Sequence, residues 1–165
     1  NMALFKFAQR MFLKRKSSIY KDAPNFSMFG IGDYSYAPYK VGVSGFYKKP
    51  LFSVLASSNS IPIMTDDTSY FICFTTYDSA YVAMLILNST RVQQFLSTIA
   101  FLDAKRPYTK KVLERIDFHK ILQSIQITEL IDTEKALGLE KYINENMLSS
   151  FHLLPELSQR TFLLC

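Results

Sequence analysis

The chain is poor in cysteine and has no long apolar run. Its 165 residues include two cysteines, Cys73 in an apolar stretch and Cys165 at the terminus, and no tryptophan. Two cysteines placed in this way form neither a disulfide framework nor a metal site, which favours a reducing, cytoplasmic setting. No apolar stretch approaches the roughly 20 residues of a membrane span, so no membrane partner is expected. The length and the 48% hydrophobic content predict one ordinary globular domain.

Glycine is scarce as well, and its distribution is informative. Four of the five glycines lie within residues 26–49: Gly30, Gly32, Gly42 and Gly45. Gly30-Ile31-Gly32 lacks the further glycine of a dinucleotide fingerprint and is no P-loop, so a nucleotide cofactor is not expected. Tyrosines alternate with lysines in the same segment. Flat stacking surfaces next to positive charge are typical of a surface that binds nucleic acid.

Positive charge is concentrated in two blocks of a chain whose net charge is +5. Residues 1–50 carry nine Lys or Arg against two Asp, and residues 101–127 carry six against three acidic residues. Residues 51–100 contain only one basic residue, Arg91. If folding brings the two blocks together, they form one positive face of the kind that binds a phosphate backbone.

Residue periodicity predicts an α+β fold. Helical spacing of apolar residues from Leu4 to Lys16 predicts a basic amphipathic helix at the start. Alternation and β-branched content then predict a small mixed β-sheet, with strands around Val41 and Val43 and at Leu51–Ala56, Ile61–Met64 and Tyr70–Thr75. A helical half follows, with helices at Ala80–Leu87 after an N-cap at Asp78, and at Thr90–Ala100, Pro107–Lys120 and Asp132–Asn146. We predict a domain over residues 1–127 and a helical extension over 128–165 packed on it.

Acidic residues at two places raise the alternative of a metal site. Asp66 and Asp67 are paired carboxylates, the usual ligands of magnesium, although the neighbouring threonines and serine favour a turn. Asp103 and Lys105 match the end of a metal-dependent nuclease motif, although no Pro-Asp pair precedes them and a salt bridge is the simpler interpretation. The segment 103–111 also precedes a predicted helix, where a phosphate group would be favoured.

Several segments in this order resemble a known family. They are RKSS, FSMFGIGDYSYAPYKVGVSGFYKK, IMTDDTSYFICF, LILNSTRVQQFL and FLDAKRPYTKKVLERIDF. Together they resemble the TaqI-like C-terminal target-recognition region of adenine-specific DNA methyltransferases and of fused restriction-modification enzymes. The resemblance covers roughly residues 5–120, and its most specific parts are FGIGDYSYAPYKV and DAKRPYTKKVL.

The resemblance implies a non-catalytic fragment of a larger enzyme. Such enzymes methylate a flipped adenine with S-adenosylmethionine, using an Asn-Pro-Pro-aromatic motif in a separate catalytic domain. This motif is absent here, because Ala37-Pro38-Tyr39 supplies one proline and the aromatic residue but no asparagine. The expected partners are therefore double-stranded DNA and an N-terminal methyltransferase domain of the same polypeptide. S-adenosylmethionine is expected in that missing domain, and no cofactor or metal in this chain.

The resemblance also implies roles for individual residues. Base-edge or stacking contacts are expected from Asp33, Tyr34, Tyr36 and Lys40. Phosphate contacts are expected from Arg15, Lys16, Ser17, Lys48, Lys49, Lys105, Arg106 and Lys110. Two rival interpretations stay open: a protein-docking module whose basic face is solvated, and a metal-dependent nuclease that uses Asp66, Asp67, Asp103 and Lys105.

Overall fold

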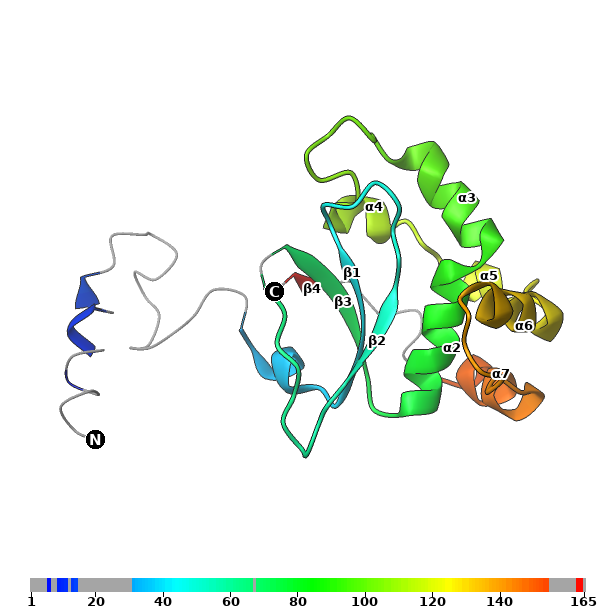
Figure 1. The fold of residues 1–165 in the computed structure, drawn as a ribbon, viewed down its shortest axis with the longest axis horizontal. Coiled ribbons are helices and arrows are strands. Elements are labelled where there is room, and N and C mark those ends of the chain that lie inside the picture. The colour runs from blue at the N-terminus through cyan, green and yellow to red at the C-terminus, as the bar shows by residue number, and fades with distance from the viewer. Residues whose placement is uncertain are drawn as a thin grey trace. The chain divides into compact units, whose positions relative to one another are not determined.

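Figure 1 shows the computed structural model of the chain, which forms two compact units, residues 1–32 and 33–165. The structure describes residues 6, 9–11, 13–14, 31–66, 68–154 and 163–164. In the first unit, residues 6, 9–11 and 13 are helical, within the range predicted for the basic amphipathic helix. Arg15, Lys16 and Ser17, predicted to contact phosphates, lie outside the described residues.

The second unit is built on a four-stranded sheet, which confirms the α+β class. Its strands are β1 (Tyr39–Ser44), β2 (Ser53–Ala56), β3 (Ser69–Phe74) and β4 (Leu163–Leu164), in the order β2-β1-β3-β4. Every pairing among them is antiparallel, where the sequence predicts a mixed sheet. The strand predicted at Ile61–Met64 is wrong, because only Ile61 forms an isolated bridge, to Ser58.

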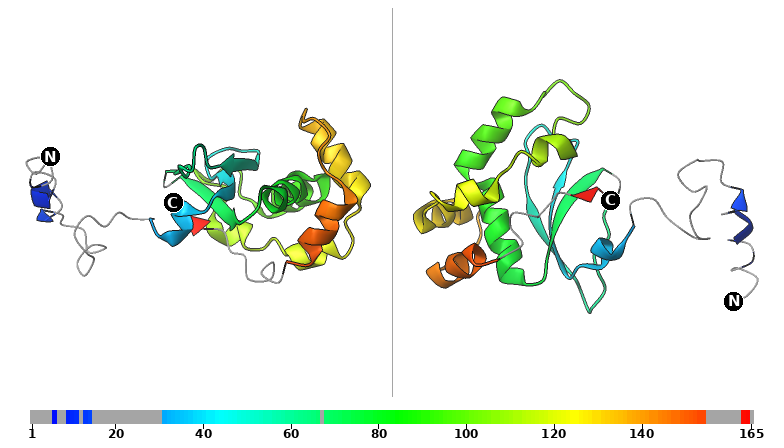
Figure 2. Two further views of the ribbon diagram at one scale, coloured as in Figure 1. Left: turned by 90° about the horizontal axis from the view of Figure 1, so that it is seen from below. Right: turned by 180° about the vertical axis from the view of Figure 1, so that it is seen from behind.

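The two faces of the sheet have different roles. Val41, Val43 and Ile72 alternate with their neighbours and lie on the face that packs against α2 (Tyr77–Asn88). All three are buried, and residues 80–87 of α2 are buried around its whole circumference. The opposite face carries Lys40 and Gly42 of β1 beside Phe71 of β3. Figure 2 shows α2 on one side of the sheet, with α6 and α7 beyond it.

The helical half contains six helices among the described residues: α2, α3 (Thr90–Ile99), α4 (Lys110–Leu113), α5 (Phe118–Leu122), α6 (Ile127–Ala136) and α7 (Glu145–His152). The N-cap of α2 is Thr76, whose hydroxyl accepts from the Ser79 amide at 3.3 Å, so the predicted cap Asp78 falls in the first turn instead. Ser89 caps α3 in the same way. Apart from these shifts, α2 and α3 lie where the sequence predicts them.

Two of the predicted helices are interrupted. The helix predicted over residues 107–120 is replaced by α4 and α5, because the Asp117 carboxylate accepts from the Lys120 amide at 3.1 Å and starts a new helix there. The helix predicted over 132–146 is replaced by α6 and α7. Gly138, with a φ of 69°, adopts the left-handed conformation that ends α6, and Asn144 caps α7.

Helices α6 and α7 both pack against α2, in the same unit as the sheet. Glu134 of α6 is buried and joins these elements, since its carboxylate accepts from the Tyr81 hydroxyl at 2.7 Å and from the Tyr142 and Ile143 amides. A domain boundary between residues 127 and 128 stays a prediction. Within the described residues, no helix is long and apolar enough to cross a membrane.

Candidate nucleic-acid interface

Two basic segments far apart in the sequence meet at one end of the sheet. The Tyr108 hydroxyl donates to the Lys48 carbonyl at 3.0 Å, which ties residues 105–110 to the loop between β1 and β2. The Arg106 guanidinium lies over the Phe46 ring, 4.8 Å from its centroid. Tyr108 is buried, and this burial raises the pKa of its hydroxyl. We call the resulting surface the basic end and define it by Lys48, Lys49, Lys105, Arg106 and Lys110.

Gly45 allows the loop between β1 and β2 to lie close to the segment that contains Tyr108. Its amide donates to the Thr68 carbonyl at 2.9 Å, and a Cβ atom there would lie 2.9 Å from the Tyr70 ring and 3.5 Å from the Tyr108 carbonyl oxygen. The far end of the loop is held by Asn88 of α2, which exchanges two hydrogen bonds with the backbone of Phe52. The loop that carries Lys48 and Lys49 is therefore anchored at both ends.

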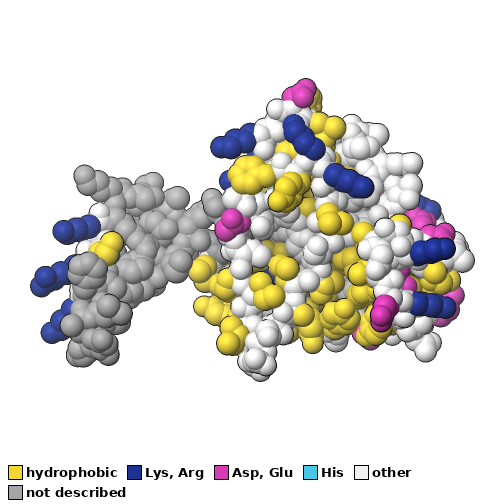
Figure 3. Space-filling model, in the orientation of Figure 1, with side chains coloured by type: hydrophobic (Ala, Val, Ile, Leu, Met, Phe, Trp, Pro, Cys, Tyr) yellow, Lys and Arg dark blue, Asp and Glu magenta, His cyan; other side chains and the backbone are white. Residues whose placement is uncertain are grey.

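Exposed aromatic side chains accompany the positive charge. Tyr47 is 71% exposed and Phe101, just before the second basic segment, is 84% exposed. Figure 3 shows dark blue Lys and Arg side chains beside yellow hydrophobic ones at the top of the larger unit. Phe46 and Phe101 were not predicted as site residues. Each lies close in the sequence to one of the two predicted basic segments, and this proximity was the signal that could have identified them. Aromatic surface between cations suits both the bases and the phosphates of a nucleic acid.

The residues predicted to contact bases lie elsewhere. Asp33, Tyr34 and Tyr36 belong to the short 3-10 helix η2 (Asp33–Tyr36), which precedes the start of β1, whereas the basic end follows its last residue, Ser44. The length of β1, roughly 17 Å at 3.3 Å per residue, separates the two groups. Tyr36 is 62% exposed, and the Tyr34 ring packs on Phe71 with 6.0 Å between centroids. Among the described residues, the structure does not bring η2 to the phosphate-contact candidates of the basic end.

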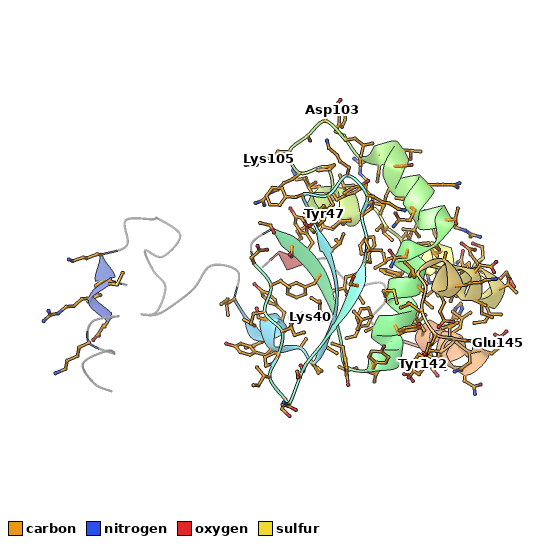
Figure 4. The ribbon with its side chains drawn as sticks, viewed as in Figure 1. Lys40, Tyr47, Asp103, Lys105, Tyr142 and Glu145 are labelled. Atoms are coloured by element: carbon orange, nitrogen blue, oxygen red, sulfur yellow. The ribbon has the colours of Figure 1, made fainter. Side chains whose placement is uncertain are left out.

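Lys40 is placed in the interior. Its side chain is buried, and the ammonium donates to the Ile63 carbonyl at 2.9 Å and to the Ala37 carbonyl at 3.3 Å. It also lies 5.6 Å from the centroid of the Phe71 ring. Figure 4 shows Lys40 and Tyr47 toward opposite ends of the sheet. In this conformation Lys40 holds residues 37 and 63 against β1 by hydrogen bonds. Its ammonium group does not reach the surface, where a base edge would lie.

Of the acidic residues in the nuclease alternative, Asp66 holds local structure. The Asp66 carboxylate accepts from the amide and hydroxyl of Thr68 and from the Ser69 hydroxyl, as a turn requires. These donors, Thr68 first, lower the pKa of Asp66. Asp103 is exposed, and Asp67 lies outside the described residues. In the part of the chain that the structure describes, no three His, Cys, Asp or Glu side chains gather so that they could hold a metal ion.

Comparison with known proteins gives one relationship. No family model matches the chain, and no solved structure matches it. The chain is 37% identical over 111 residues to the type II methyltransferase M.NspV of Nostoc sp. (strain ATCC 29411 / PCC 7524). The match covers 67% of this chain and 23% of that protein, so the chain corresponds to a minor part of its relative. By this similarity the chain is related to a type II methyltransferase.

Proposed function

We propose that this chain is the DNA target-recognition part of an adenine-specific DNA methyltransferase or restriction-modification enzyme, and that it binds duplex DNA through the basic end. The observation that carries the proposal is the hydrogen bond from Tyr108 to Lys48, which joins two basic segments separated by 60 residues. The similarity to a type II methyltransferase supports the same conclusion.

The basic end has the chemistry for duplex binding. Lys48, Lys49 and Lys105 are exposed on connecting segments, where their ammonium groups can follow a phosphate backbone. Arg106, next to Lys105 in the sequence, lies over the Phe46 ring. Lys110 follows on the first turn of α4. Such contacts supply affinity and orientation, while sequence is distinguished by side chains that reach base edges. For that second role we keep Asp33, Tyr34 and Tyr36 as candidates, because η2 lies outside the hydrophobic core.

The proposal assigns methyl transfer to the remainder of a longer polypeptide. The match to M.NspV leaves most of that protein unmatched. Binding of S-adenosylmethionine and the transfer reaction belong to that remainder, and the chain binds no cofactor of its own in this proposal. Its role is to hold DNA while the partner domain acts on the base.

The test is fluorescence anisotropy with a labelled random-sequence duplex, titrated at several salt concentrations. The test variant changes Lys48, Lys49 and Lys105 to alanine. The control variant changes Lys120, Lys135 and Lys141, which are exposed lysines of the helical half, to alanine and removes the same total charge. Because each phosphate contact contributes about 0.9 to the slope of log affinity against log salt, we expect the test variant to lose about 2 to 3 in slope and the control to lose little.

Two results contradict the proposal. If the two triple variants weaken binding equally, only net charge matters and the basic end is not the interface. If the unchanged chain binds no DNA even at low salt, the docking-module interpretation gains support instead.

A further inference from the structure

Four tyrosine rings meet at the start of α2. Tyr77, the first residue of this helix, lies at the centre, with its ring centroid 5.9 Å from that of Tyr39 and 5.8 Å from that of Tyr81. Tyr142 completes the group, 5.7 Å from Tyr77 and 5.1 Å from Tyr81. The rings come from β1, from α2 and from the segment between α6 and α7. We call this surface the tyrosine patch and define it by Tyr39, Tyr77, Tyr142 and Asp78.

Hydrogen bonds fix the rings of the patch in place. The Tyr142 amide donates to the buried Glu134 carboxylate at 2.8 Å, and the Tyr142 hydroxyl donates to the Asp78 carboxylate at 2.7 Å. Tyr81, against which two of the rings pack, donates its hydroxyl to the same Glu134 oxygen. A surface that is already ordered loses little conformational entropy when it binds a partner.

Two of the rings are open to solvent. Tyr77 is 39% exposed and Tyr142 is 46% exposed, and the Asp78 side chain is exposed next to them. Exposed aromatic side chains that gather at one place are typical of protein interfaces, in which tyrosine and arginine are enriched. The patch therefore has the composition of a docking surface.

The charge beside the rings is negative. Asp78 contributes the carboxylate that contacts the Tyr142 hydroxyl, and residues 140–146 carry two glutamates, Glu140 and Glu145, against one lysine, Lys141. Figure 4 shows Tyr142 and Glu145 well away from Lys105 of the basic end. Because the phosphates of a nucleic acid would be repelled here, the patch favours a cationic protein segment instead.

An arginine side chain fits this combination of groups best. Its planar guanidinium can lie flat on an aromatic ring and at the same time donate to a carboxylate, whereas the ammonium of a lysine is compact and strongly hydrated. Asp78 keeps acceptor capacity for such a bond, because an ionised carboxylate accepts about four hydrogen bonds and Tyr142 supplies one.

We propose that the tyrosine patch docks a basic segment of a partner protein through an arginine, with the guanidinium against the exposed rings of Tyr77 and Tyr142 and bonded to the Asp78 carboxylate. This interaction goes beyond the proposed DNA-binding function and does not depend on it. The patch and the basic end carry opposite charge, so the partner and the DNA do not compete for one surface.

The experiment uses three labelled peptides of eight residues, built from glycine and serine with two arginines, two lysines or two citrullines. Citrulline has nearly the shape of arginine and no charge. Binding to the chain is followed by anisotropy at low salt without DNA. We expect the arginine peptide to bind about tenfold more tightly than the lysine peptide, and the citrulline peptide to bind more weakly still.

Variants of the patch locate the binding. Asp78→Asn removes the charge and keeps an acceptor for Tyr142, and should weaken binding of the arginine peptide about tenfold. Tyr77→Ala should abolish the binding, and Tyr77→Phe, which keeps the ring, should retain it. The matched controls are Asp132→Asn and Phe95→Ala, at exposed positions on α6 and α3, and both should bind as the unchanged chain does. Circular dichroism of each variant shows whether it is folded.

Three results overturn this inference. They are equal affinity for the arginine and lysine peptides, full affinity in folded Asp78→Asn, and self-association of the unchanged chain in sedimentation that Asp78→Asn removes, since a second copy would then occupy the patch. A chain that binds duplex DNA and none of the peptides overturns this inference alone. A chain that binds the arginine peptide and no DNA overturns the proposed function alone.

Discussion

The hydroxyl of Tyr81 lies 2.7 Å from the carboxylate of Glu134, and this hydrogen bond joins α2 to α6 inside the protein. Both residues are buried. The same carboxylate oxygen accepts from the Tyr142 and Ile143 amides, so one buried acceptor organises the turn that leads to α7. A buried charge with three donors is stable only while those donors remain in place.

We predict that Tyr81 makes the stability of the fold decrease at alkaline pH. Burial, and then the hydrogen bond to Glu134, raises the pKa of Tyr81 in the folded state. Its contribution to the free energy of unfolding is therefore fully present below the ordinary tyrosine pKa of about 10 and is lost as the pH rises toward the folded-state value. Tyr81→Phe should cost about 1–2 kcal/mol at neutral pH and should make the alkaline decrease less steep. Urea denaturation at neutral pH and above pH 10 measures both effects.

The control for this prediction is Tyr47→Phe, which removes an exposed hydroxyl. It should change neither the free energy of unfolding at neutral pH nor its decrease at alkaline pH. An unchanged alkaline decrease in Tyr81→Phe would show that other groups cause it.

We predict that Lys40 stabilises the fold and makes no contact with DNA. Lys40→Ala would leave the Ala37 and Ile63 carbonyls without their donor and create a cavity, which should lower the free energy of unfolding by about 2–4 kcal/mol. The salt dependence of DNA binding, measured well below the unfolding temperature, should equal that of the unchanged chain. A reduced slope in a fully folded variant would restore Lys40 to the list of DNA contacts.

Tyr108 should affect DNA binding from a buried position. Tyr108→Phe removes the hydrogen bond to the Lys48 carbonyl and leaves the ring in place, so we expect a loss of stability of about 1 kcal/mol. Because that bond positions the two basic segments relative to each other, affinity for duplex DNA should fall several-fold with an unchanged salt slope. Anisotropy and urea denaturation on the same preparation give the two values. Unchanged affinity would show that the segments hold their places without this bond.

Gly45 should tolerate no side chain. In Gly45→Ala the new methyl group would lie 2.9 Å from the Tyr70 ring, and this buried ring would have to move. We expect a loss of about 1–3 kcal/mol in the free energy of unfolding. Gly138→Ala is the comparison, because nothing lies within 4 Å of that position and only its left-handed backbone is strained. Because Gly45 has no positive φ, an unchanged free energy of unfolding in Gly45→Ala would show that the Tyr70 ring moves aside without cost.

The sequence predicts the central elements of this fold well, for identifiable reasons. Val41 and Val43 alternate with their neighbours, and residues 80–87 are continuously apolar, so β1 and α2 follow from local pattern alone. The errors occur where a distant contact or a single cap decides the structure. The Ile63 carbonyl accepts from Lys40 instead of from a neighbouring strand, and Asp117 starts a helix in the middle of a helical pattern.

The candidate interface could be predicted in part. The basic character of Lys48, Lys49, Lys105 and Arg106 is visible in the sequence, but their proximity depends on one hydrogen bond across 60 residues. The interior position of Lys40 was not predictable from the sequence. Alternation along β1 places this lysine on the outer face of the sheet, and it is buried only because residues 34–37 and 63 cover that face.

Strand β4 has a consequence for how this unit folds. Its residues, Leu163 and Leu164, pair with Phe71 and Tyr70 of β3. During synthesis, β3 emerges before every described α-helix of the second unit, whereas its partner at this edge emerges after all of them. This edge of β3 therefore has no strand to pair with until β4 has been synthesised. Unpaired strand edges of this kind can pair with other chains and so promote aggregation. Concentrated refolding is thus the condition under which this protein should aggregate most readily.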